Sequence, residues 1–119
     1  MVAHRRALES LWQGRCSIVV RQERRNTTSK RVEFDEVAVY TNQPCRLSYK
    51  TVRQTTEGNN AAEPTQVATL FISSDVVVPA GSKIVVAQNG RTAHYARSGE
   101  PAVYTHHQEI VLALFPGWA

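Results

Sequence analysis

The amino-acid sequence predicts a mainly β protein, a small antiparallel barrel of about six or seven strands with a short N-terminal helix and one long flexible loop. Three observations support this fold class. Apolar and polar residues alternate over several short segments, as in strands that bury one face. Turn signals separate these segments at steady spacing, and the dipeptide Asn89-Gly90 is the strongest hairpin signal among them. One segment near the N-terminus has helical periodicity instead.

Length and composition indicate a single globular domain, residues 1–119. Hydrophobic residues make up 42% of the chain and charged residues 20%, which is close to the average of globular domains and excludes a wholly disordered chain. No internal repeat is present, and no run approaches the roughly 20 apolar residues of a membrane span. The first twelve residues include basic side chains but no apolar stretch, so we expect no signal peptide and no membrane partner.

The segment 2–13 is predicted to be a short amphipathic helix that either packs on its own domain or docks on a partner. Four of its residues share one stripe: His4, Leu8, Leu11 and Trp12. Gly14 follows as a helix C-cap. From residue 16 the period changes to two. The expected strands are residues 16–21, 34–40, 45–50, 67–72, 84–86, 91–97 and 109–115.

Two polar stretches interrupt the strands. Residues 22–31 contain no apolar side chain and are predicted to form an exposed loop or hairpin tip, and residues 41–44 are predicted to break the following strand. The segment Thr51–Pro64 has no period over about 14 residues, which is unusual inside a small domain and typical of functional or disordered loops. We expect this long loop to be mobile in the free chain.

The net charge of +4 and the pI near 9.4 favour contact with polyanions, although a solvated basic face is an equally ordinary explanation. Lys50 and Arg53 open the long loop. The densest basic cluster lies in the first polar stretch: Arg21, Arg24, Arg25, Lys30 and Arg31. Few aromatic residues are interleaved with these charges, which disfavours base stacking of the kind seen in OB-folds.

No arrangement of residues indicates catalysis or a cofactor, so we expect neither. The adjacent His106 and His107 would point to opposite faces of a strand, and only one of them could join His94. Nucleophile elbows, phosphate-binding glycine motifs and paired-carboxylate motifs are missing from the sequence. Cys16 and Cys45 are expected to be buried free thiols, with a cross-strand disulfide as the alternative.

Several segments from residue 37 onward are the most distinctive part of the chain. They are Val37-Ala38-Val39-Tyr40, Pro44-Cys45-Arg46-Leu47-Ser48, Pro79-Ala80-Gly81-Ser82-Lys83-Ile84, Asn89-Gly90, the run from Tyr95 to Tyr104, His107-Gln108-Glu109-Ile110, and Gly117-Trp118. Together they resemble the head-closure proteins, also called head–tail connectors or stoppers, of tailed phages and prophages. The resemblance extends over nearly the whole chain.

This resemblance implies a virion structural protein, made in the bacterial cytoplasm, that forms a twelvefold ring at the head–tail junction. The ring would lie below the portal and its adaptor, retain the packaged double-stranded DNA and give the tail proteins a platform. The long loop would then project into the channel as the stopper, with these candidate residues: Lys50, Thr51, Arg53, Glu57, Gly58, Asn59 and Asn60. The basic cluster at residues 21–31 would face partners, and the isolated chain is expected to be monomeric.

Two other functions remain open at this point. A tail-completion or tail-terminator protein of the same junction would share the small size and the ring symmetry. An OB-like nucleic-acid-binding module would share the basic charge but would need more exposed aromatic residues.

Overall fold

The structure, a computed structural model, describes residues 11–55 and 62–118. Within these ranges the chain forms seven antiparallel strands and no helix, and none of its elements is a helix that could cross a membrane. The strands are β1 (Gly14–Arg25), β2 (Val32–Thr55), β3 (Ala62–Ser73), β4 (Lys83–Gln88), β5 (Arg91–Arg97), β6 (Ala102–Val103) and β7 (His107–Leu114). The predicted mainly β fold is confirmed. The predicted helix lies outside the described residues except at 11–13, which are not helical.

Six of these strands close into a ring. β1 pairs with β2, β2 with β3, β3 with β7, β7 with β5, β5 with β4, and β4 again with β1. The short β6 extends the ring by pairing with the beginning of β7. Closure gives each of these six strands a paired neighbour on both sides over part of its length, which reduces the edge available for uncontrolled pairing.

The barrel is filled by aliphatic side chains that alternate along the strands. Five of them have no exposed surface: Ile18, Leu70, Ile72, Ile84 and Ile110. Burial of one such side chain contributes about 1.5–3 kcal/mol. Gln108 is also buried, and its Nε2 donates hydrogen bonds to the carbonyl oxygens of Ser73 and Val76. This amide fastens the segment after β3 to the barrel without leaving a buried polar group unsatisfied.

The predicted break at residues 41–44 is wrong, because β2 runs through it without interruption. The register passes from Cys16↔Gln43 to Val19↔Ala38, so β2 has two more residues than β1 over this stretch. Asn42 has φ 52°, a left-handed conformation that asparagine tolerates better than most residues. Bulges of this kind bend a strand and increase its twist. A sequence that looks like a turn is therefore an irregularity inside one strand of 24 residues.

The predicted extent of the long loop is also wrong. Residues 51–55 of β2 pair in register with residues 62–66 of β3, from Thr51↔Gln66 to Thr55↔Ala62. Cross-strand backbone hydrogen bonds form this ladder, and they do not require the apolar alternation on which a sequence-based prediction depends. Residues 56–61, between the two strands, lie outside the described residues. The first polar stretch is a hairpin tip as predicted, but only residues 26–31 fall between β1 and β2.

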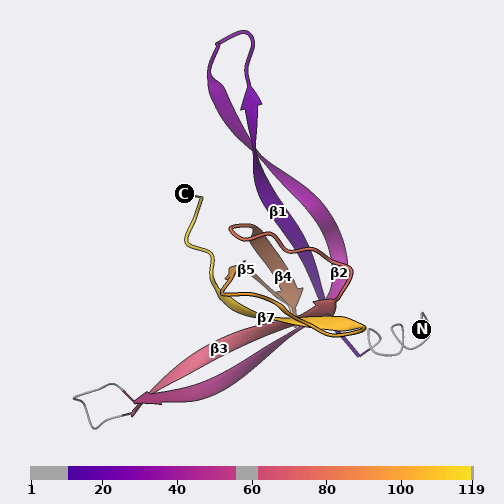
Figure 1. Cartoon of the computed structure of the whole chain (residues 1–119), viewed down its shortest axis with the longest axis vertical. Coiled ribbons are helices and arrows are strands. Elements are labelled where there is room, and N and C mark those ends of the chain that lie inside the picture. Colours follow the sequence, from indigo (N-terminus) through magenta and orange to yellow (C-terminus); the bar gives the residue numbers. More distant parts are fainter. Residues whose placement is uncertain (1–10, 56–61, 119) are drawn as a thin grey trace.

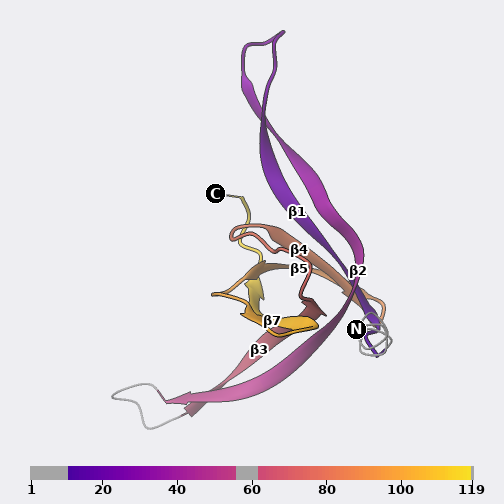
Figure 2. The same ribbon diagram turned by 45° about the vertical axis from the view of Figure 1, so that its right-hand side comes forward.

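Two long hairpins extend from the barrel (Figure 1). β1 pairs with β4 only as far as Val19, so residues 20–37 form a two-stranded first arm. β3 pairs with β7 only from Ala68 onward, so residues 50–55 and 62–67 form a second arm. Figure 2 shows the arms leaving in different directions, with β2 common to both. The radius of gyration, 17.4 Å, exceeds the about 13.5 Å expected of a compact domain of this length.

Candidate interaction site

The first arm carries the basic cluster singled out in the sequence, and the structure divides that cluster into two groups. Arg25, Lys30 and Arg31 are exposed at or beside the hairpin tip. Arg21 and Arg24 lie lower on β1, where they contact side chains of β2. The five cations therefore do not form one continuous basic surface.

Arg24 is held by two carboxylates on the opposite strand. Its Nη2 lies 2.7 Å from Glu33 Oε2, and its Nε lies 2.9 Å from Asp35 Oδ2. Arg24 pairs directly with Glu33 in the register, and Asp35 is the next residue of β2 on the same face. The acidic residues of this arm thus neutralise one of its own arginines.

Arg21 covers an aromatic ring on the other face of the arm. Its guanidinium carbon lies 4.2 Å from the centroid of Phe34, a distance at which a cation and a ring face attract each other. Phe34 nevertheless remains 53% exposed. Val32, two residues earlier on the same face, is 51% exposed, so this face offers two apolar side chains to solvent.

The root of the first arm is braced by the C-terminal segment. Trp118 Nε1 donates a hydrogen bond of 3.2 Å to Glu36 Oε2, and Lys83 Nζ forms an ion pair with the other oxygen of the same carboxylate. Phe115 packs edge-on against Trp118, with centroids 5.0 Å apart. The hydrogen bonds from Lys83 and Trp118 hold the pKa of Glu36 below its usual value. Sequence reasoning missed this cluster, although Gly117-Trp118 was among the distinctive segments.

The predicted stopper residues fall on the second arm. Lys50 and Thr51 are exposed at its root, and the backbone of Arg53 pairs with that of Pro64. Glu57, Gly58, Asn59 and Asn60 lie outside the described residues. The structure therefore positions the base of the predicted loop but gives no contacts for its centre, and the stopper role stays a prediction.

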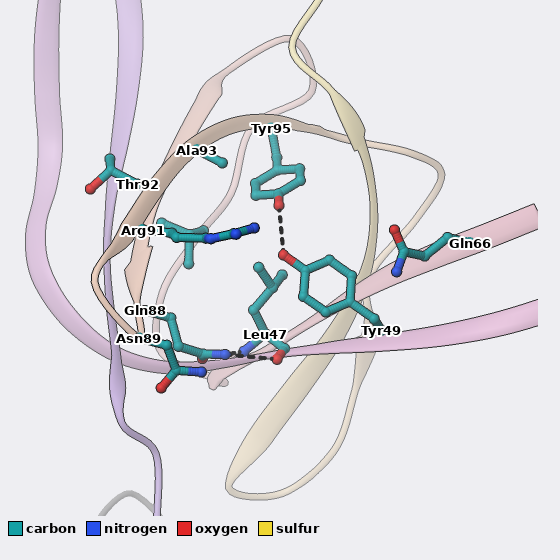
Figure 3. A pocket seen from close by; sticks show the side chains of 10 residues that line it. Leu47, Tyr49, Gln66, Gln88, Asn89, Arg91, Thr92, Ala93 and Tyr95 are labelled. Atoms are coloured by element: carbon teal, nitrogen blue, oxygen red, sulfur yellow. Dashed lines mark hydrogen bonds between the residues drawn. The ribbon is translucent and has the colours of Figure 1, made fainter.

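A pocket of about 830 Å³ opens between the β2–β3 strands and the β4–β5 hairpin. The hydroxyls of Tyr49 and Tyr95 share a hydrogen bond of 3.0 Å across it, and the Arg91 side chain extends toward its middle (Figure 3). Burial and the bond to Tyr49 raise the pKa of Tyr95 to about 12, so its hydroxyl stays protonated. The lining supplies hydroxyl, amide and guanidinium groups but no carboxylate, imidazole or thiol.

The place where β1 begins is closely packed, and its residues Gly14, Leu47 and Gln88 are called the seam. The Gln88 amide bonds to both backbone groups of Leu47, accepting from its N–H at 2.8 Å and donating to its carbonyl oxygen at 3.0 Å. It thereby pairs with β2 just beyond Cys45, the residue opposite the first residue of β1. A Cβ on Gly14 would lie 2.9 Å from both Cys45 O and Gln88 Oε1, so glycine is required there.

Cys16 and Cys45 are buried free thiols next to this seam, as one of the two sequence interpretations expected. Their side chains interact, and the hydrogen bond to Cys45 together with burial raises the pKa of Cys16. Cys16 therefore stays a neutral thiol, which is the inert form of the side chain.

His94 and His107, which the sequence analysis considered for one common site, lie apart in the structure. The backbone carbonyl of His94 accepts a hydrogen bond from the N–H of Phe115, just beyond the end of β7. His107 is the first residue of β7. The two histidines therefore lie near opposite ends of this strand, which spans roughly 20 Å or more. His107 stacks between Tyr104, with centroids 4.8 Å apart, and Phe71, at 6.3 Å. Over residues 11–55 and 62–118 no group of three or more His, Cys, Asp or Glu side chains is placed to hold a metal ion.

Among solved structures, one similarity is close enough to compare architectures. The phage-like element PBSX protein xkdH from Bacillus subtilis superimposes with a TM-score of 0.51, over 84% of this chain and 91% of that chain. This chain shares the fold of that protein. The sequences are 12% identical, so the likeness concerns architecture alone. No protein-family model matches the chain, and the search of curated proteins found no match.

Proposed function

We propose that this chain is a non-enzymatic structural protein of a phage or prophage particle and that it acts at the head–tail junction. In this role it closes the DNA-filled head below the portal and adaptor and gives the tail its platform. The observation that carries the proposal is the fold shared, over most of both chains, with a protein of a phage-like element. The resemblance of the segments from residue 37 onward to head-closure proteins supports a place at the head–tail junction.

The shape of the molecule supports a role in assembly. The closed ring of strands leaves little free edge in the barrel body, which favours contact between copies through side-chain surfaces or through the arms. The arms extend well beyond what the core needs, as the radius of gyration of 17.4 Å indicates. We propose a homo-oligomeric ring, a dodecamer, that contacts the adaptor on one side and tail proteins on the other, and an isolated chain that is monomeric.

Exposed apolar side chains supply candidate contact surfaces for such a ring. Phe34 and Val32 lie on the first arm, and Val103 (65% exposed) lies beside Tyr104 (52% exposed) on the barrel. These are separate surfaces of one chain, and a head-to-tail ring contact requires two different patches that meet between copies. Burial of such side chains is the usual driving force of association.

The test is electron microscopy of particles produced with this gene deleted, with heads and tails scored separately. Separate tails beside emptied or leaking heads are the expected result. Filled heads with tails of abnormal length would point instead to a tail-terminator role. Normal, intact particles would reject the junction role and favour a nucleic-acid-binding module.

A further inference from the structure

The tip of the first arm, residues 25–31, carries cations that the arm does not neutralise. Arg25, Lys30 and Arg31 are all exposed, and none of them forms an ion pair with a side chain in the described part of the chain. The nearest carboxylates of β2, Glu33 and Asp35, are already bound by Arg24. The tip therefore presents three positive charges to whatever approaches it.

Internal hydrogen bonds hold the tip in one shape. Asn26 N–H donates to Arg31 O at 2.9 Å, which closes the loop. The Asn26 side-chain oxygen accepts from the backbone N–H groups of Thr28 (2.9 Å) and Ser29 (3.2 Å). The same side chain donates to Glu33 Oε1 at 3.1 Å, which ties the loop to β2. A preorganised loop loses less conformational entropy when it binds a ligand.

The side chains of the tip are of the types that contact phosphate. Besides the three cations, the loop carries the hydroxyls of Thr27, Thr28 and Ser29, and all three residues are exposed. Arg, Lys, Ser and Thr are among the side chains that contact nucleic-acid backbones. No aromatic side chain occurs in residues 25–31, so the loop cannot stack on bases.

The same composition disfavours a protein partner at this position. The loop between the strands, residues 26–31, has no apolar side chain that could serve as the buried centre of a protein interface. The apolar Phe34 lies further down the arm, under Arg21. A convex, polar, cationic loop on a projecting hairpin suits a phosphodiester backbone.

We infer that the tip of the first arm binds the phosphate backbone of double-stranded DNA without sequence preference. With three cations engaged, the logarithm of the binding constant falls with the logarithm of salt concentration with a slope of about −2.7. Binding is therefore weak and readily reversed at physiological salt. This inference does not depend on the proposed place of the protein in a particle.

The experiment titrates a fluorescent 30-base-pair duplex with the full chain at several salt concentrations. The tip variant replaces three residues together, R25Q/K30Q/R31Q. The matched control removes the same charge from exposed arginines elsewhere, R15Q/R46Q/R91Q. We expect the tip variant to bind at least about tenfold more weakly at 50 mM salt with a slope near zero, and the control to keep most of the wild-type slope.

Circular dichroism checks that both triple variants are folded, and Lys30→Gln alone is expected to reduce the slope by about 1. Equal losses in the two triple variants would overturn the inference, because binding would then follow net charge and not the tip. A wild-type chain that does not bind the duplex would also overturn it. Unchanged DNA binding together with failed particle assembly by the tip variant would assign the tip to an acidic protein partner. The deletion experiment on particles is independent of each of these outcomes.

Discussion

The strands β1 and β2 run through both the barrel body and the first arm, but different interactions stabilise the two regions. In the barrel, Cys16, Ile18 and Cys45 are at most 1% exposed and contact other apolar side chains. In the arm, the cross-strand contacts include the ion pairs of Arg24 and the cation–π contact between Arg21 and Phe34. The hydrogen-bond ladder between β1 and β2 therefore starts in the apolar core and continues into a solvent-exposed arm within a few residues.

This difference shows what a projecting hairpin needs in order to stay paired. An isolated two-stranded ribbon is only marginally stable in water, so the arm depends on its attachment to the barrel and on the cluster at its root. The ion pairs of the arm are exposed, and each contributes little by itself. Perturbing the barrel should therefore cost more than perturbing the arm.

The largest effect is expected from Ile18→Ala in the barrel. Ile18 has no exposed surface, so truncation leaves a cavity and should lower the free energy of unfolding by about 2–5 kcal/mol. Denaturant unfolding measures this loss. Val32→Ala on the arm is the control, with an expected change within about 0.5 kcal/mol. Equal losses in the two variants would remove the proposed contrast between barrel and arm.

A smaller loss is expected from Gly14→Ala at the seam. The new Cβ would lie 2.9 Å from Cys45 O, a backbone atom that cannot move freely. Overpacking of this kind should lower the free energy of unfolding by about 1–3 kcal/mol. Gln13→Ala, at the exposed neighbouring residue, is the control and should behave like the wild type. A fully stable Gly14→Ala chain would mean that the seam is looser than the structure indicates.

On the arm, Arg24→Ala should lower the free energy of unfolding by no more than about 1 kcal/mol, because its two ion pairs are solvent-exposed. The loss should shrink in high salt, which screens exposed charges. Thermal unfolding at low and high salt checks both statements. A loss that is large and independent of salt would show that the arm is part of the cooperative core.

The smallest effect is a pH dependence at the root of the arm. The pKa of Glu36 is lowered by Lys83 and Trp118, so its contribution to stability is present above the unfolded pKa of about 4.3 and is lost as pH falls through the lower folded pKa. Glu36→Gln should therefore flatten the acidic part of the stability–pH curve. Glu23→Gln, an exposed carboxylate on the same arm, serves as the control. Identical curves for the two variants would contradict the role of Glu36.

Local patterns were sufficient to predict the class of fold, and they failed where pairing does not depend on apolar alternation. Asn89-Gly90 is a hairpin turn with both residues at positive φ, as its chemistry requires. Asn42 gave a similar turn signal, yet its left-handed conformation makes a bulge inside β2. The paired residues of the second arm lack alternation, and their backbone ladder forms without it.

Only the residue types of the candidate site could be predicted from the sequence, and not their arrangement. The cations at residues 21–31 were visible in the sequence, but their division into two groups depends on the register that sets Arg24 opposite Glu33. The contact between Trp118 and Glu36 joins residues 82 positions apart, and no local signal specifies such a contact. The cations of the tip differ from Arg24, because the carboxylates of Glu33 and Asp35 on β2 contact Arg24.

The continuity of β2 also has a mechanical consequence. The two arms share the strand β2, so a load applied between the paired parts of the arms passes along β2 through the barrel and acts on the ladder hydrogen bonds there. A displacement of the first arm is therefore passed toward the second arm along the 24 residues of β2.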